Sequence, residues 1–196
     1  MTKVKKIIPF EKFSEWFNEA KNDTRIIEPT AVSLATIEEN RPVNRMILLK
    51  HFDSRGFCFY TNFSGRKGQN LAKNNNAALC FYWGILGRQI RIEGKVCEVT
   101  KHEADSYFAS RRRGSQIGAW ASKQSQKLEN STEFESRIDK FTKKYEGKEV
   151  PRPEFWSGYR LNPQRIEFWQ EGDFRLHDRK VYEKDGDGWV VKKLYP

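Results

Sequence analysis

The stretch that decides the fold class is Arg88-Gln89-Ile90-Arg91-Ile92-Glu93-Gly94-Lys95-Val96-Cys97-Glu98-Val99. Its apolar residues Ile90, Ile92 and Val96 share one face of an extended chain, because successive side chains of a β-strand point to opposite sides. The polar residues between them share the other face. We therefore predict a strand of a sheet with one polar side, where a ligand could bind.

Similar runs of β-branched and aromatic residues occur on both sides of this segment. Turn-forming residues separate them, as at Asp53-Ser54-Arg55-Gly56 and Asp185-Gly186-Asp187-Gly188. Strands that follow one another through short turns favour an antiparallel sheet over a doubly wound fold. The predicted strands are residues 31–37, 43–51, 57–61, 77–83, 88–99, 156–161, 165–170, 176–182 and 189–194.

Four helices are predicted in addition to these strands. The first starts at Pro9 with an aromatic stripe at helical spacing and ends at Asn22-Asp23, and a second, short one follows Ser64-Gly65-Arg66-Lys67 through Leu71. Thr100-Lys101-His102-Glu103 has the spacing of a capping box, which predicts a helix over 101–109. The last runs from Thr132 to Tyr145 and is predicted to bury Phe134, Ile138, Phe141 and Tyr145. The predicted fold is α+β but mainly β: an antiparallel barrel with peripheral helices.

The composition is that of a single basic domain. The 196 residues can bury one sizeable core, so residues 1–196 are predicted to form one domain, with 1–8 as a flexible N-terminus. The chain has 36 Lys and Arg residues against 26 Asp and Glu, a net charge of +10. This charge favours an anionic partner: a nucleic acid, an anionic membrane or a phosphorylated small molecule. Charge alone does not choose among them.

The cysteines and histidines support neither a disulfide framework nor a metal site. Cys58, Cys80 and Cys97 lack Cys-x-x-Cys spacing, so buried free thiols in a reducing compartment are expected. The histidines, at positions 51, 102 and 177, lie far apart, and no metal is expected. No long apolar segment or cleavage site is visible, which predicts a cytoplasmic protein without a membrane partner.

The common catalytic motifs are absent, including the P-loop, Gly-x-Gly-x-x-Gly, His-Glu-x-x-His and Gly-x-Ser-x-Gly. What remains is basic residues beside hydroxyl and amide residues where predicted strands end or helices begin. They occur at four places: Arg45 to Lys50; Tyr60-Thr61 with Arg66-Lys67; Tyr107 with Arg111-Arg112-Arg113 and Ser115; and Trp169 with Arg175, His177 and Arg179.

Each place has a plain structural explanation when it is taken alone. Arg45 to Lys50 suits a core strand with solvated ends, and basic loop residues are commonly just solvated. At a helix start, however, backbone amides and the helix dipole can join Arg66-Lys67 in holding a phosphate. Strand alternation would send Arg175, His177 and Arg179 to one face, where they call for an anionic or polar ligand.

Together these places resemble the pyridoxine/pyridoxamine 5'-phosphate oxidase family. The resemblance also includes residues 115–120, 122–125 and 166–170, and it runs from about Phe10 to Pro196 in the family's order. It implies an FMN-binding split β-barrel, antiparallel and Greek-key-like, with peripheral helices. It also implies a homodimer in which both chains hold each FMN at their interface.

The resemblance assigns a role to each matching position. The implied FMN contacts are Arg45, Met46, Ile47, Leu48, Leu49, Lys50, Tyr60, Thr61, Arg66, Lys67, Gln89, Gln124, Ser125, Trp169 and Arg179. The implied substrate contacts are Lys50, Tyr107, Arg111, Ser115, Arg175, Leu176 and His177. Arg175 and His177 are the catalytic candidates: Arg175 would cover the substrate ring on the face opposite the flavin, and His177 would hold the substrate by hydrogen bonds.

The implied reaction is oxidation of pyridoxine or pyridoxamine 5'-phosphate to pyridoxal 5'-phosphate, in biosynthesis or salvage of that product. A hydride passes to FMN, molecular oxygen reoxidises the flavin to give hydrogen peroxide, and the amine substrate also releases ammonia. The protein's main task is to stack the substrate ring on the flavin.

Two departures from the family pattern are visible. Relatives often carry a basic, tyrosine-containing segment before the first helix that closes over the substrate, and here it is expected to be missing. Arg112 stands where many relatives have proline, so the loop bearing Arg111 is expected to be more mobile and the substrate more weakly bound.

Three other functions compete with this one. A related flavin oxidase, similar to phenazine-biosynthetic enzymes, would share much of the FMN site but differ in the substrate cradle. A basic nucleic-acid-binding module would be colourless and would bind with a steep salt dependence. A barrel that binds FMN without catalysis would show no turnover, and the presence of Arg175 and His177 argues against it.

Overall fold

A computed structural model describes residues 3–4 and 8–196. The helices of this part are α1 (Ile8–Asn22), α2 (Arg66–Lys73), α3 (Lys101–Ser110), α4 (Arg113–Ala121) and α5 (Ser131–Lys144). The strands are β1 (Lys3–Val4), β2 (Ala31–Glu38), β3 (Arg41–Leu48), β4 (His51–Asp53), β5 (Gly56–Asn62), β6 (Asn76–Trp83), β7 (Arg88–Glu98), β8 (Trp156–Gln170), β9 (Asp178–Asp185) and β10 (Gly188–Leu194). Two short 3-10 helices, η1 (Gly84–Leu86) and η2 (Asp173–Arg175), precede β7 and β9.

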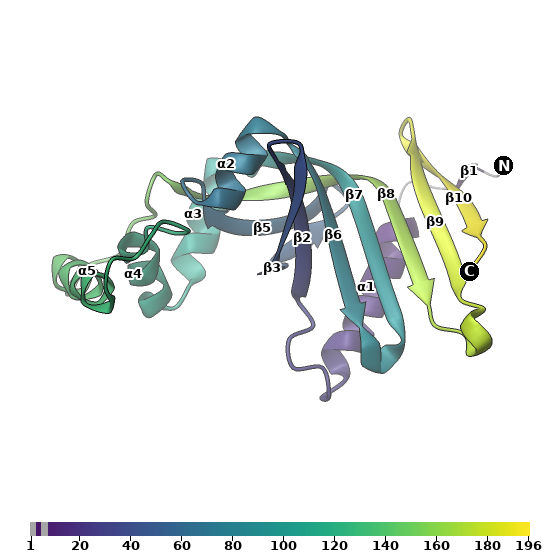
Figure 1. The fold of residues 1–196 in the computed structure, drawn as a ribbon, viewed down its shortest axis with the longest axis horizontal. Coiled ribbons are helices and arrows are strands. Elements are labelled where there is room, and N and C mark those ends of the chain that lie inside the picture. Colours follow the sequence, from purple (N-terminus) through teal and green to yellow (C-terminus); the bar gives the residue numbers. More distant parts are fainter. Residues whose placement is uncertain (1–2, 5–7) are drawn as a thin grey trace. The chain divides into compact units, whose positions relative to one another are not determined.

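The strands form one sheet with antiparallel neighbours. Its main path runs β1-β10-β9-β8-β7-β6-β2-β3, while β5 pairs with β4 and with β8. The pairings of β2 with β3 and β6, of β6 with β7, and of β9 with β8 and β10 are all antiparallel. Figure 1 shows β6, β7, β8 and β9 side by side within this sheet. The described strands leave the path open, with β1 and β3 at its ends.

The chain divides into two compact units. The first comprises Met1–Phe59, Asn74–Cys97 and Arg160–Pro196, and so contains α1 and most of the strands. The second comprises Tyr60–Lys73 and Glu98–Tyr159, and contains α2 to α5. Each unit has its own buried apolar residues.

The core of the first unit lies between α1 and one face of the sheet. Phe13 of α1 is fully buried, and its ring centroid lies 4.8 Å from that of Phe57 and 5.4 Å from that of Phe81. Trp16 meets Phe168 of β8 edge-on, with 5.3 Å between the ring centroids. Figure 1 shows α1, in purple, crossing this face of β6 to β8. The opposite face of these strands is left to polar side chains.

The core of the second unit is aromatic. Phe108 of α3 meets the face of Trp156 at 5.1 Å between ring centroids. Trp120 of α4 packs on Phe141 and Tyr145 at the end of α5, at 5.5 and 5.7 Å. Aromatic rings of α3, of α4 and of the end of α5 therefore form much of this core, and such rings bury large apolar areas.

Two predicted helix starts have different outcomes. The capping box is confirmed: the Thr100 hydroxyl accepts from the Glu103 N–H at 3.1 Å, and the Glu103 carboxylate accepts from the Thr100 N–H at 2.9 Å. The last helix instead takes Asn130 as its N-cap and begins at Ser131. Phe134, predicted to be buried, is 37% exposed, because the buried face of α5 lies toward its C-terminal end.

Two elements were not predicted as they occur. Helix α4 was missed, and β8 is one strand of 15 residues instead of two. Pro163 lies inside β8, where it has no N–H to donate. A Cβ added to Gly94 of β7 would lie 2.1 Å from the Asn162 carbonyl oxygen, so a glycine is needed for the close approach of β7 and β8 there.

Some expectations concern the N-terminus and the thiols. Residues 1–2 and 5–7 of the predicted flexible stretch lie outside the described residues, whereas Lys3–Val4 pair with β10.

All three cysteines are free, but only Cys58 is buried. The prediction of a buried thiol is wrong for Cys97, because strand alternation puts its neighbour Val96 in the core and Cys97 at the surface. Among the described residues, no helix is long and apolar enough to cross a membrane.

Candidate functional site

Three residues predicted to contact FMN lie on the polar face of the first unit's sheet. Gln89, Trp169 and Arg179 come from the neighbouring strands β7, β8 and β9, and Trp169 is the direct partner of Arg179 in the register. Hydrogen bonds from Arg88 to Gln170 and from Arg91 to Glu167 join β7 to β8 on either side of Gln89. The structure thus brings these three predicted residues together.

A buried carboxylate lies on the same face. Glu167 of β8 is 1% exposed and accepts hydrogen bonds from Arg91, Arg165 and Arg179. Burial would raise the pKa of Glu167, but the three guanidinium groups outweigh it and hold that pKa below its usual value. Sequence reasoning gave Glu167 and Arg91 no role. The alternation of charged residues along β7 and β8 was the available signal.

The segment Arg45 to Lys50 does not present one surface. Arg45 shares a face with its partner Leu34, and its guanidinium donates to the Thr36 hydroxyl at 2.7 Å. Met46 points the other way and is 64% exposed. Strand β3 ends at Leu48, and of the two predicted FMN contacts that follow, Leu49 is buried and Lys50 is exposed.

The predicted catalytic residues line an open groove of about 890 Å³ in the first unit, formed by residues 84–87, 169–175 and 177. The rings of Trp169 and His177 lie 4.5 Å apart between centroids, and His177 Nδ1 accepts from the Gly172 N–H at 3.3 Å. Leu176 is 70% exposed.

The strand predicted from residue 176 begins only at Asp178, so alternation does not align Arg175 with Arg179. Arg175 lies instead in η2, with φ 66° after a Phe174 φ of 55°. Two consecutive left-handed residues other than glycine are strained, and such strain clusters at functional sites.

A second set of predicted FMN contacts forms a polar cluster in the second unit. Lys67 near the start of α2 donates to the Thr61 hydroxyl at 3.1 Å and to Gln124 Oε1 at 2.8 Å, and Thr61 donates to the same Gln124 oxygen at 3.0 Å. Arg66 is the first residue of α2, as predicted, and is exposed. Ser125 adopts φ 68° beside Gln124. A cation at a helix N-terminus beside hydroxyl and amide groups suits a phosphate.

A third group of predicted residues lies against Trp156. The rings of Tyr60 and Tyr107 stack at 4.0 Å, and Tyr60 stacks on Trp156 at 5.6 Å. The Arg111 guanidinium carbon lies 4.8 Å from the Trp156 ring centroid. Ser115, also predicted to contact the substrate, is exposed on α4.

The Arg111 side chain is desolvated. Its Nη1 is buried and has no hydrogen-bond partner among the described residues. Burial lowers the pKa of Arg111, an effect that Tyr107 partly offsets, and burial raises the pKa of Tyr107, which keeps its hydroxyl protonated as a donor. A buried cationic donor beside a phenol suits an anion.

The three consecutive arginines have different environments. Arg113 donates to the backbone carbonyls of Lys148 and Tyr145, and so joins α4 to the chain that follows α5. Arg112 is exposed, and its φ of −55° is one that proline also adopts. Only Arg111 lies against the aromatic group that contains Tyr107 and Trp156.

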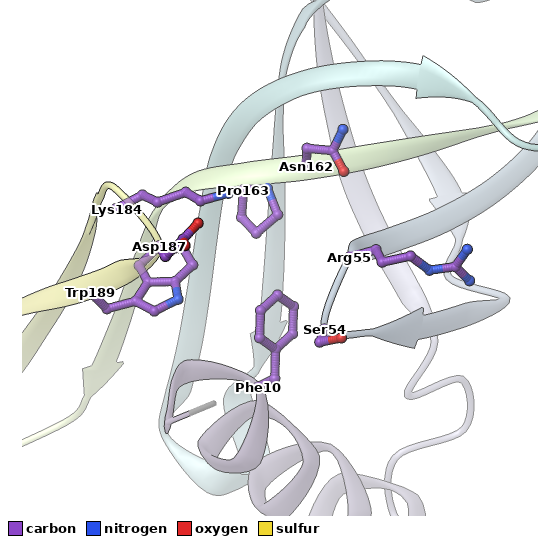
Figure 2. A pocket seen from close by; sticks show the side chains of 8 residues that line it. All are labelled: Phe10, Ser54, Arg55, Asn162, Pro163, Lys184, Asp187 and Trp189. Atoms are coloured by element: carbon purple, nitrogen blue, oxygen red, sulfur yellow. The ribbon is translucent and has the colours of Figure 1, made fainter. Parts of the chain in front are cut away.

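A separate cavity of about 550 Å³ lies in the first unit (Figure 2). Phe10 and Trp189 form apolar walls, with 6.4 Å between ring centroids, and Lys184 and Asp187 come from the β9–β10 hairpin. Figure 2 shows the Arg55 guanidinium pointing away from this space. Its described lining contains none of the residues that the sequence predicts for FMN or substrate.

The open antiparallel sheet has the fold of the split-barrel class, to which flavin-binding proteins of similar structure belong. Residues 19–145 match the model of the pyridoxamine 5'-phosphate oxidase family, and 156–196 match the pyridoxine 5'-phosphate oxidase C-terminal dimerisation region. The chain belongs to the pyridoxamine 5'-phosphate oxidase family and is an FMN-dependent oxidoreductase. The predicted family, fold and cofactor are thereby confirmed, and the C-terminal match supports the predicted homodimer.

Similar proteins agree with this assignment. The pyridoxine/pyridoxamine 5'-phosphate oxidases of Rhodospirillum rubrum and Rubrobacter xylanophilus are 50% and 49% identical to this chain. The alignments cover 96% of this chain in both cases, and 96% and 87% of those proteins. Among solved structures, PhzG from Burkholderia lata 383, in complex with tetrahydrophenazine-1-carboxylic acid, has a TM-score of 0.90 and 32% identity, with 96% of this chain and 92% of that chain covered.

A more distant structure has the same fold. An FMN-binding protein of Nostoc punctiforme, related to pyridoxamine 5'-phosphate oxidase, has a TM-score of 0.76 at 13% identity, with 98% of both chains covered.

Proposed function

We propose that the protein oxidises pyridoxine 5'-phosphate and pyridoxamine 5'-phosphate to pyridoxal 5'-phosphate, in biosynthesis or salvage of that product. The alcohol would lose two electrons and two protons to molecular oxygen, giving hydrogen peroxide. The amine would consume one water as well and release ammonia. The names of relatives about half identical over 96% of the chain support this substrate class.

The residues present fit FMN. Lys67, Thr61 and Gln124 form a polar cluster at the start of α2, where the phosphate of FMN would bind. A Cβ on Gly65 would lie 2.8 Å from the Gln124 oxygen, so a glycine leaves this cluster room to form. When bound, FMN supplies the redox chemistry, as a two-electron acceptor that oxygen reoxidises.

The first unit carries further predicted FMN contacts. We assign Gln89, Trp169 and Arg179 to the ring system, together with the chain around Met46 and Leu48. We also propose a homodimer in which each FMN lies at the interface and is held by both chains. The match of residues 156–196 to a dimerisation region supports the dimer itself.

The substrate assignment depends on Arg111 above all. Its buried Nη1 lacks a partner among the described residues, beside the protonated hydroxyl of Tyr107. A buried, unsatisfied guanidinium costs stability unless a ligand uses it. A phosphate dianion would take both donors, with Ser115 of α4 as a further donor.

The chemistry itself requires little from the protein beyond placement. Arg175 would cover the face of the substrate ring opposite the flavin. His177, fixed by its ring contact with Trp169 and by the Gly172 N–H, would hold the ring substituents by hydrogen bonds. A near-attack arrangement of this kind can supply several orders of magnitude in rate.

One alternative has a specific observation in its favour. The PhzG structure is similar over nearly the whole chain and contains a tetrahydrophenazine carboxylic acid, which has no phosphate. A related flavin oxidase for a tricyclic acid would use the flavin residues above but would not need a cradle for a phosphate dianion. The phosphate requirement of the substrate therefore separates the two functions.

The test compares turnover of pyridoxamine 5'-phosphate with that of pyridoxamine, with pyridoxal 5'-phosphate or pyridoxal as the measured product. Loss of a charge-assisted contact predicts kcat/KM at least about 100-fold lower for the unphosphorylated amine, because two or more donors go unused. Equal kcat/KM for the two amines would contradict the proposed cradle. Turnover of tetrahydrophenazine-1-carboxylic acid alone would favour the alternative.

A further inference from the structure

The buried carboxylate of Glu167 gathers arginines from three adjacent strands. Arg165 Nη2 donates to its Oε2 at 2.8 Å, and Arg91 Nη2 donates to the same oxygen. Arg179 Nε donates to Oε1 at 2.9 Å, and its Nη2 lies 2.8 Å from that atom. We call these four residues the Glu167 cluster. Arg91 comes from β7, Arg165 from β8 and Arg179 from β9.

The Glu167 cluster leaves one buried donor unsatisfied. Glu93 Oε1 accepts from Arg165 Nη1 at 2.8 Å, and Glu183, opposite Arg165 in the register, also interacts with it electrostatically. Arg91 Nε, however, is buried without a hydrogen-bond partner among the described residues. An arrangement built only for stability would not be expected to leave a buried donor unsatisfied.

Glu167 fixes one edge of the Arg179 guanidinium. Two of its nitrogens face the same carboxylate oxygen, and the third, Nη1, donates to the Tyr195 carbonyl at 3.0 Å. A guanidinium has five N–H donors in a rigid plane, so these contacts set the plane while leaving other N–H groups for a ligand. An arginine without such contacts would lose rotamer freedom each time a ligand bound.

We propose that Glu167 is a positioning residue of the flavin site, which holds the Arg179 guanidinium ready for FMN. The inference rests on the proposed function, in which Arg179 contacts the flavin. Glu167 itself is buried beneath the arginines and is not assigned a contact with FMN or substrate.

Charge and positioning predict opposite results for the variant Glu167→Gln. Removal of a negative charge makes this sheet face more positive, so electrostatics alone would strengthen binding of FMN, which is an anion. If Glu167 positions Arg179, the same change weakens FMN binding, because the amide cannot accept from three guanidinium groups. Glu93→Gln is the matched control: it removes the same charge from the same sheet face, and among the described residues the Glu93 carboxylate accepts from Arg165 and not from Arg179.

The experiment measures the FMN dissociation constant by quenching of FMN fluorescence on addition of apoprotein. The proteins are the wild type, Glu167→Gln, Glu93→Gln, Arg179→Lys and the double variant Glu167→Gln/Arg179→Lys. We expect Glu167→Gln to bind FMN at least about tenfold more weakly, and Glu93→Gln to stay within about twofold of wild type. In the Arg179→Lys background, Glu167→Gln should raise the FMN dissociation constant by less than about twofold, because the guanidinium through which Glu167 acts is already absent.

Each other outcome counts against the proposal in a recognisable way. An equal effect of Glu167→Gln in both backgrounds would show a general structural role, and unchanged or tighter binding would show a charge effect only. If Glu167→Gln loses the circular dichroism of the folded apoprotein, the same cycle is run with Glu167→Asp, which keeps the charge and shortens the side chain. A wild type that binds no FMN would overturn the proposed function as well.

Discussion

Arg111 and Arg113, on either side of Arg112, provide a matched pair of variants with opposite predicted effects on stability and on substrate binding. Arg111→Met removes a half-buried guanidinium whose Nη1 is buried and has no partner among the described residues. It relieves about 1–3 kcal/mol of desolvation cost and loses about 0.5–2 kcal/mol of cation–π attraction to Trp156. The free energy of unfolding should therefore lie between about 1 kcal/mol below and about 2.5 kcal/mol above that of the wild type, as the difference of these two effects.

Binding of substrate should change far more. A hydrogen bond to a charged group contributes about 1.5–3 kcal/mol, so loss of the Arg111 contact predicts a KM for pyridoxamine 5'-phosphate about 10- to 150-fold higher. The assay is steady-state formation of pyridoxal 5'-phosphate at saturating FMN, with urea unfolding of the apoprotein alongside.

Arg113→Met is the control. It removes two hydrogen bonds to the carbonyls of Lys148 and Tyr145 and should cost about 1–2 kcal/mol of stability, while KM stays within about threefold of wild type. If Arg111→Met proved to be strongly destabilised with a normal KM, the assignment of Arg111 to the substrate would be refuted.

Three further predictions follow from single positions. Arg112→Pro should raise the free energy of unfolding, measured by urea titration, by about 0.4–1 kcal/mol without loss of turnover. The reason is that φ of Arg112 is already −55° and the preceding residue is extended, so proline fits without strain. Burial of Asp53 is outweighed by hydrogen bonds from a neighbouring arginine, which lower its pKa from 3.8 to about 2. The folded-state pKa is depressed, so the wild type should be more stable than Asp53→Asn by a constant amount above about pH 4. This difference in the free energy of unfolding should shrink toward zero as the pH falls to about 2, and unfolding curves across that range measure it. Gly65→Ala should keep the fold but weaken FMN binding about fivefold or more, because the new Cβ displaces the flexible Gln124 amide. Gly68→Ala should instead lower the unfolding temperature, because its Cβ would lie 2.4 Å from a backbone oxygen.

Most of the architecture could be predicted from local patterns. The alternation at residues 88–99, the turn at Asp53-Ser54-Arg55-Gly56 and the capping box at Thr100 each correspond to an observed element. Helix α4 could not be predicted in the same way, because its N-cap Arg112 makes no side-chain cap and Gly114 and Gly118 lower its helix propensity. Its stability comes from packing of Ile117 and Trp120, which is a tertiary effect.

The chemical roles inside the candidate site were less predictable. Three consecutive arginines look alike in sequence, and only the fold shows that Arg111 is buried on Trp156 while Arg113 holds backbone carbonyls. Arg175 was expected on a strand face but lies in a left-handed turn, because β9 begins only at Asp178. Glu167 looked like one charge in an alternating strand, and only the fold shows that Arg91 of β7 and Arg179 of β9 join Arg165 of the same strand as its partners.

The most direct test of the central claim is anaerobic mixing of the FMN-loaded protein with pyridoxamine 5'-phosphate, followed by admission of oxygen. We predict that the visible absorbance of the bound flavin bleaches on mixing and returns with oxygen, with one pyridoxal 5'-phosphate formed per flavin bleached. A flavin that stays oxidised in the presence of this substrate would contradict the proposed function, although the fold and the family would stand.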